Sequence, residues 1–169
     1  MPQDDRSDGF QALSDYEKRW KALIEHSTDI ITIINPDGLI TFVSPSVVHI
    51  LGYRVDEVIG KNPLDFLHPD DVTINKKFFL VLIRTPDRLA TRKVRLMAKD
   101  GSWKIFEVTF KNLSHDPVIG GVVVNFRDIT EKKEYENLLR DYRNNLEQIV
   151  RNRTEELIKT NQRLMEEIQ

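Results

Sequence analysis

The residues that could carry out chemistry are few in this chain, and they do not gather into a catalytic pattern. There is no cysteine, which excludes disulfides, thiolate catalysis and zinc sites built on cysteine. The four histidines stand in the contexts "HST", "HIL", "HPD" and "HDP", which are too scattered to form a metal cluster. Asp70 and Asp71 are adjacent at an expected helix start, but no nucleophile and base accompany them. The sequence therefore favours a binding or interaction role over an enzyme, and it predicts no metal site.

Length and charge limit the class of protein further. The chain has 169 residues, of which 40% are hydrophobic and 31% charged, and its net charge is −2. These values suit one ordinary globular domain with an appendage, and the interspersed charges argue against a nucleic-acid partner. No apolar run approaches the roughly 20 residues that span a bilayer, and the acidic start "MPQDDRSDGF" is unlike a secretory signal. We expect a cytoplasmic protein without a membrane span, and a disordered tail over residues 1–13.

An amphipathic helix is predicted over residues 14–26. Tyr16, Trp20 and Leu23 fall on one of its faces at helical spacing. Such a face either covers a hydrophobic core or contacts a second copy of the chain, and the sequence leaves both interpretations open.

Five strand patterns and several short helical patterns follow this helix. Two β-branched runs within 29–45 flank the turn "NPDG", which predicts a hairpin. Short helices come next, and the longest, over 68–84, begins with "HPDD", which suits the N-terminal end of a helix. Three further runs with alternating apolar residues cover 91–101, 103–113 and 119–128. This order predicts an α+β domain over 27–130, with a five-stranded antiparallel sheet and short helices on one face.

A long helix is predicted over residues 131–169. It contains neither Pro nor Gly, and Tyr135, Leu146 and Leu157 recur every eleven residues, which keeps an apolar stripe on one helix face. A helix of about forty residues is not stable alone on propensity. We therefore expect a parallel coiled coil with a second copy of the chain, the alternative being a frayed helix. The residues predicted at the dimer interface are Tyr16, Trp20, Leu23, Tyr135, Leu139, Leu146, Val150, Leu157, Leu164 and Ile168.

The stretch "FRDIT" joins the last predicted strand to this helix with almost no loop. Asp128 can cap the helix start with Glu131 three residues later, or Thr130 can be the N-cap itself. Because nothing flexible separates strand from helix, a movement of the strand must reach the helix. Asp128, Ile129 and Thr130 are therefore the predicted signal-relay residues. The plainer interpretation is a helix cap that contributes about 1 kcal/mol.

Four stretches occur in a fixed order along the chain: "INPDGLITFVSPS", "LGYRVDEVIGKNPLDFLHPDD", "KDGSW" and "FRDIT". In that order, over 27–130, they resemble the PAS domain, a sensory module of signalling proteins, with Ser44 standing where the family commonly has Asn. The tail "VRNRTEELIKTNQRLMEEI" resembles the signalling helix that joins PAS modules to histidine kinases, or sometimes to diguanylate cyclases. No histidine stands in a phosphoacceptor pattern and no glycine-rich ATP-binding stretch occurs. The chain thus resembles the sensor part of a larger protein.

The resemblance implies a ligand pocket between the sheet and its helices. The residues expected to line it are Ile31, Ile33, Val48, Leu51, Phe66, Phe78, Leu82, Val94, Leu96, Phe106, Val108, Val122 and Val124. The alternative is that these side chains simply fill the core, since a small domain needs all the apolar surface that it can bury.

The resemblance also limits the cofactors and implies one ion pair. Flavin chemistry through a cysteine adduct is excluded, because Pro63 occupies the place of that cysteine. Non-covalent FAD and haem are both disfavoured. Haem-binding relatives take a histidine from the long helix, whereas here His68 precedes that helix as an expected cap and only His49 could face inward. No cofactor is therefore assigned. The family also implies a pair between Glu57 and Lys99.

Two functions are compatible with these patterns. The first is a regulatory PAS module that dimerises and relays a signal through the strand-to-helix junction to an output domain. The expected output domain is a histidine kinase outside this chain, with a diguanylate cyclase as the alternative. The second function is a constitutive dimerisation or protein-interaction module without a ligand. An internal cavity with a few inward polar groups would favour the first.

Overall fold

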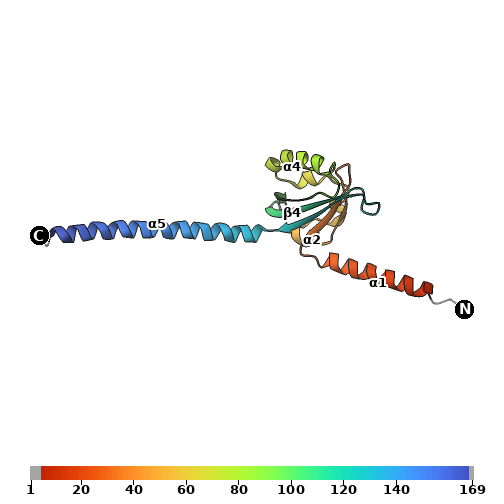
Figure 1. The fold of residues 1–169 in the computed structure, drawn as a ribbon, viewed down its shortest axis with the longest axis horizontal. Helices are drawn as coiled ribbons and strands as arrows, with labels where there is room; N and C mark the ends of the chain where they lie inside the picture. The colour runs from red at the N-terminus through yellow and green to blue at the C-terminus, as the bar shows by residue number, and fades with distance from the viewer. Residues whose placement is uncertain (1–4, 168–169) are drawn as a thin grey trace. The chain divides into compact units, whose positions relative to one another are not determined.

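The chain divides into two compact units between Ile129 and Thr130 (Figure 1). The computed structural model describes the backbone of residues 5–167 and the side chains of residues 15–166. The elements of the first unit are α1 (Asp5–Glu25), β1 (Ile30–Ile34), β2 (Ile40–Val43), α2 (Ser46–Leu51), α3 (Val55–Val58), the 3-10 helix η1 (Pro63–Phe66), α4 (Pro69–Leu82), β3 (Leu89–Met97), β4 (Trp103–Leu113) and β5 (Gly121–Asp128). The second unit is the single helix α5 (Thr130–Glu167).

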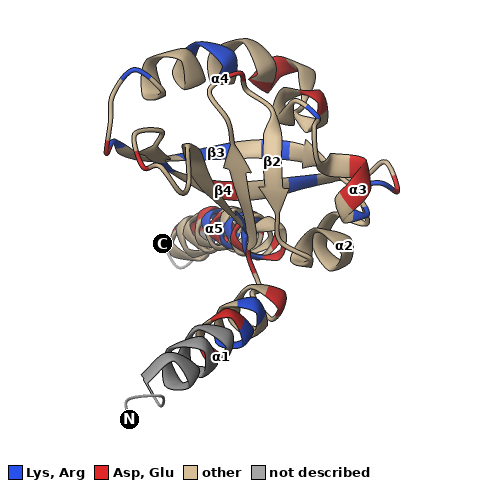
Figure 2. Ribbon diagram, turned by 90° about the vertical axis from the view of Figure 1, so that its right-hand side faces the viewer, with Lys and Arg blue, Asp and Glu red and all other residues tan. Residues whose placement is uncertain are grey.

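The first unit is built around a five-stranded antiparallel sheet with the strand order β2-β1-β5-β4-β3. The chain leaves the sheet after β2, forms α2, α3, η1 and α4, and returns as β3. Of these helices, α4 lies across one face of the sheet (Figure 2). The predicted α+β class, with an antiparallel five-stranded sheet and a long C-terminal helix, is confirmed.

The core lies on the side of the sheet that faces α4. On β4, Phe106, Val108 and Phe110 are buried in alternation, as their spacing predicts. Val122 and Val124 of β5 are completely buried beside them. Leu82 closes the core from the C-terminal end of α4.

On β1 the predicted direction of the side chains was wrong by one residue. Ile31 and Ile33 are half-buried and lie on the outer face, whereas Ile30, Thr32 and Ile34 are the inward positions. A strand of almost uniform β-branched residues shows no alternation, so the sequence does not indicate which set faces the core.

The first helix begins earlier than its pattern suggested. The prediction placed a disordered tail over residues 1–13, but α1 starts at Asp5. Extending an existing helix is far easier than nucleating one, and the added segment contains no proline. The apolar face of Tyr16, Trp20 and Leu23 is 66–76% exposed, so it does not cover the core.

Asn112 of β4 fixes the end of α4 to the sheet. Its side chain is fully buried, and Nδ2 donates to the carbonyl oxygens of Leu82, Ile83 and Thr85 at 2.9–3.1 Å. Its Oδ1 accepts from the backbone N–H of Ser114 at 3.0 Å. One amide therefore binds the carbonyl of Leu82, the last residue of α4, and two carbonyls of the chain that directly follows the helix.

Replacing Asn112 with alanine should lower the free energy of unfolding by about 2–4 kcal/mol, because several buried polar groups lose their partner at once. Urea denaturation of the purified chain measures this loss. Thr109→Ala, on the outer face of the same strand, should cost much less. Equal effects of the two substitutions would show that Asn112 does not hold the helix in place.

Candidate functional site

A partly open cavity of about 220 Å³ lies in the first unit, between the sheet and the helices. Five of the residues predicted to line a pocket do so, namely Leu51, Phe66, Phe78, Val94 and Leu96. Apolar side chains form most of the remaining wall, including Phe126 of β5. The interior is thus not completely filled by its own side chains.

The other predicted lining residues lie elsewhere. Leu82, Phe106, Val108, Val122 and Val124 are completely buried, but they pack in the core instead of lining the cavity. Ile31 and Ile33 lie on the outer face of the sheet, as described above.

Val48 was also placed wrongly, because it is 42% exposed and its neighbour Val47 is the buried residue. In α2, a helix of six residues, two adjacent valines are too few to indicate which one faces inward. The same turn carries His49, which is exposed, and none of the cavity-lining residues is a histidine. The sequence left open whether His49 faces inward, and the structure places it on the surface.

The sequence prediction missed the two buried polar residues of the described cavity wall. Thr32 of β1 and Asn75 of α4 are only 4% and 7% exposed. Thr32 Oγ1 and Asn75 Oδ1 have no hydrogen-bond partner among the described residues. A sequence signal existed for each. Thr32 is the one polar residue in "IITII", and Asn75 shares the helix face of Phe78, Phe79 and Leu82.

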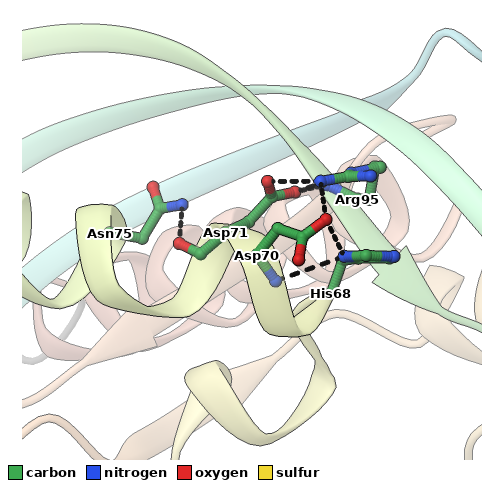
Figure 3. A network of polar contacts seen from close by, with 5 residues as sticks. All are labelled: His68, Asp70, Asp71, Asn75 and Arg95. Carbon is green, nitrogen blue, oxygen red and sulfur yellow. Dashed lines mark hydrogen bonds and ion pairs between the residues drawn. The ribbon is translucent and has the colours of Figure 1, made fainter.

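A polar network at the start of α4 positions Asn75 (Figure 3). Arg95 of β3 donates from Nη2 to Asp71 Oδ1 at 2.8 Å and from Nε to Asp71 Oδ2 at 3.0 Å. The backbone carbonyl of Asp71 in turn accepts from Asn75 Nδ2 at 2.7 Å. His68 Nδ1 accepts from the N–H of Asp70 at 3.3 Å, so His68 is the expected helix cap.

The network also affects protonation. Hydrogen bonds from the Arg95 side chain lower the pKa of Asp71, against the opposing effect of its partial burial. Two residues beyond the end of β3, Lys99 Nζ lies 2.6 and 2.8 Å from the two carboxylate oxygens of Glu57, so the implied ion pair is confirmed. The hydrogen bond from Lys99 lowers the pKa of Glu57.

The strand-to-helix junction consists of one residue, Ile129, between the end of β5 and the start of α5. Ile129 is 8% exposed, and its backbone N–H donates to the carbonyl of Ile105 in β4 at 2.8 Å. Asp128 Oδ2 lies 3.4 Å from Lys104 Nζ, also in β4. The predicted relay residues Asp128 and Ile129 are thus held by β4, and Thr130 begins the helix. Capping by Asp128 or Thr130 stays a prediction.

The outer face of β5 is tied to the start of β1. Asn125 Nδ2 donates to Asp29 Oδ2 at 2.8 Å, and Arg127 Nη2 lies 3.2 Å from the same oxygen. The hydrogen bond to Asp29 is the main cause that raises the pKa of Arg127. Asn125 and Arg127 therefore link the segment that follows α1 to the last residues of β5.

Along α5, the predicted interface residues form a stripe of open apolar side chains. Their exposed fractions lie between 44% and 68% for the described members Tyr135, Leu139, Leu146, Val150, Leu157 and Leu164. Ile168 lies outside the described residues. No helix in the described part of the chain has an apolar stretch long enough to cross a membrane.

Residues 18–129 match the PAS fold family, so the chain belongs to that family and the resemblance is confirmed. It is 37% identical to the White collar 2 protein of Neurospora crassa over 98 residues, which are 56% of this chain and 18% of that protein. The chain spans less than a fifth of the length of the curated relatives that it matches.

Solved structures agree with this assignment. The PAS domain of an HTR-like protein from Haloarcula marismortui is 26% identical, with a TM-score of 0.58, over 73% of this chain and 99% of that one. A domain of the sensory box sensor histidine kinase/response regulator from Geobacter sulfurreducens shares the fold at 20% identity, with a TM-score of 0.57, over 69% and 96% of the two chains. The first unit is therefore a PAS sensory or regulatory module.

The pair between Arg95 and Asp71 should make stability depend on pH in a defined direction. Because the folded-state pKa of Asp71 is lowered, the pair stabilises the fold above an unfolded-state pKa of about 4. This stabilisation is lost as the pH falls through the folded-state pKa. Arg95→Gln should thus lower the free energy of unfolding by a small amount at neutral pH, because solvent screens the partly exposed guanidinium.

Urea denaturation of Arg95→Gln and the unmodified chain across acidic and neutral pH tests this prediction. The difference between the two should shrink as the pH falls below about 4. Lys93→Gln, at an exposed position of the same strand, serves as the control and should show little difference at any pH. A constant difference for Arg95→Gln would contradict the assigned role of Asp71.

Proposed function

We propose that this chain senses a molecule in the PAS cavity, dimerises through α5, and relays the bound state through the β5–α5 junction to an output domain in a longer protein. The observation that carries the proposal is the junction itself, in which the single buried residue Ile129 connects the sheet to the helix. A ligand acts in such a module only by binding one of two conformations more tightly than the other.

The apolar stripe of α5 supports the dimer. At about 1.5 Å per residue, a helix of 38 residues extends roughly 57 Å, and helical propensity alone does not stabilise that length. Leu146, Val150 and Leu157 are each at least 44% exposed in the single chain. A second copy that packs along the same stripe removes these side chains from water, which is the main favourable term in such an association.

The path from cavity to helix runs along β5. Phe126 lines the cavity and packs edge-to-face with Phe106, at a distance of 6.3 Å between ring centroids. Three residues later, Ile129 is hydrogen-bonded to β4. A ligand that displaces Phe126 therefore acts on the strand that ends at Asp128, with no loop to absorb the change.

The chain itself is proposed to be a sensor without enzymatic activity. A histidine kinase is the proposed output domain, because the tail resembles the helices that precede such kinases and the Geobacter relative carries that name. A diguanylate cyclase is the alternative. The cavity with its two unpartnered oxygens favours a ligand-responsive module over a constitutive dimerisation domain.

The dimer makes a direct prediction. The purified chain should sediment as a dimer, and Leu146→Asp should dissociate it by placing a charge in the apolar stripe. Gln148→Asp introduces the same charge on the opposite face of α5, about 200° around the helix, and should leave the dimer intact. Sedimentation equilibrium measures all three proteins. A monomeric unmodified chain, or equal behaviour of the two variants, would contradict the proposed interface.

The relay makes a second prediction. In a chimera that joins this chain to a histidine kinase catalytic region, Asp128→Ala should change autophosphorylation about threefold, which corresponds to a coupling of roughly 0.6 kcal/mol. The reason is that the substitution removes the contact between β5 and Lys104. Glu57→Ala, which removes an ion pair of the same kind from Lys99, is the matched control and should have little effect. A folded Asp128→Ala chimera with unchanged autophosphorylation would refute the relay.

A further inference from the structure

We propose that the cavity selects a small, uncharged and largely apolar molecule that donates a hydrogen bond to Asn75 Oδ1. The molecule has about the size of a single aromatic ring or of two fused rings. This inference rests on the proposed sensory function and specifies the chemical class of the ligand. Four features of the cavity support this inference: the fixed orientation of Asn75, the hydroxyl of Thr32, the absence of buried charged side chains among the described lining residues, and the volume.

The orientation of the Asn75 amide is fixed by its own hydrogen bond. Nδ2 lies 2.7 Å from the carbonyl oxygen of Asp71, which can only accept, so the nitrogen must be on that side and the oxygen on the other. Figure 3 shows the amide oxygen pointing away from Asp71. Because Asp71 is held in turn by Arg95, the amide oxygen is a pre-positioned acceptor, and a ligand must bring the donor.

Thr32 supplies a second polar point on the opposite wall. It lies on β1, in the sheet, whereas Asn75 lies on α4. The hydroxyl of Thr32 can either donate or accept, and no described residue pairs with it. A buried polar group without a partner is unfavourable. A ligand that forms hydrogen bonds with these two oxygens therefore binds with a more favourable free energy than a ligand that leaves them unpaired.

The wall excludes charged ligands. Among the described residues that line the cavity, Asp37 and Lys76 are charged, and both are exposed to solvent instead of buried in the wall. Tyr53 also lines the cavity, and burial is the main cause that raises its pKa, which keeps its phenol neutral. An ionised carboxylate or ammonium inside would lose its hydration without gaining a counter-charge. The ligand is therefore neutral.

The volume sets the size. Cavities of about 150 Å³ with apolar walls bind benzene, and drug-sized ligands occupy roughly 300–1,000 Å³. At about 220 Å³, this cavity fits one or two fused rings. Indole has this size and a single N–H donor, indene has the same shape without the donor, and benzoate is a small aromatic anion. These three compounds serve as probes of the proposed class.

Isothermal titration calorimetry of the full chain with the three probes tests the proposal. Indole should bind several-fold, up to about tenfold, more tightly than indene, the change expected from one buried hydrogen bond. Benzoate should show no binding. Equal affinity for indole and indene, or binding of benzoate, overturns the proposal. So does an absence of binding at millimolar indole, in which case water satisfies the two oxygens.

Two variants locate the hydrogen bond. Asn75→Leu keeps the size of the side chain, removes the acceptor, and should abolish the preference for indole over indene. It should also leave the melting temperature unchanged or raised, because an unpartnered buried oxygen is lost, so that its folding can be verified. Thr73→Val, at an exposed position of α4, is the control and should keep the preference. An Asn75→Leu protein that still prefers indole overturns the assignment of Asn75.

Calorimetry separates this inference from the proposed relay. Loss of the dimer or an unaffected Asp128→Ala chimera would refute the relay without changing the order of affinities for indole, indene and benzoate. Conversely, a wrong ligand class leaves sedimentation and autophosphorylation as predicted.

Discussion

β5 is hydrogen-bonded along both of its edges, to β1 on one side and to β4 on the other, and the other features of the PAS domain depend on this double pairing. Its inward residue Phe126 reaches the cavity, while outward Asn125 and Arg127 hold Asp29 at the start of β1. A strand held in this way does not shift by itself. In the proposed function, a change in the cavity wall is passed on through this pairing to the neighbouring strands and to the chain that leaves at Asp128.

Much of this fold could be predicted from the sequence, because local patterns and tertiary structure agree. Alternation along β4 indicated its buried face correctly, and the abrupt change of period after "FRD" located the start of α5. The errors arose where the sequence pattern does not show which residues face the core. Ile31 and Ile33 stand in a uniform β-branched strand, and Val48 stands beside Val47 in a short helix. In both places the inward residue is selected by packing against distant segments, which a local pattern does not contain.

The chemistry of the cavity was less accessible to prediction. Thr32 and Asn75 are single polar residues among apolar ones, and a buried polar residue usually finds a partner. Their oxygens lie unpaired in a common cavity because of the distance between β1 and α4. A local sequence motif does not contain that distance. Arg95 illustrates the same point, since it is distant in sequence from Asp71 and yet bonds its carboxylate, while the backbone carbonyl of Asp71 accepts from Asn75. The ion pair therefore joins β3 to the helical turn on which Asn75 lies.

The eleven-residue period of α5 has a consequence for how such modules are joined to others. Eleven residues turn a helix by three full revolutions and about 20° more, so adding or removing one period returns the next segment to nearly the same angle. Five extra residues rotate it by about 140°, which would place the stripe from Tyr135 to Leu164 out of phase beyond the insertion. Under the proposed relay, spacers between this sensor and an output domain that differ in length by eleven residues keep the two in nearly the same rotational phase.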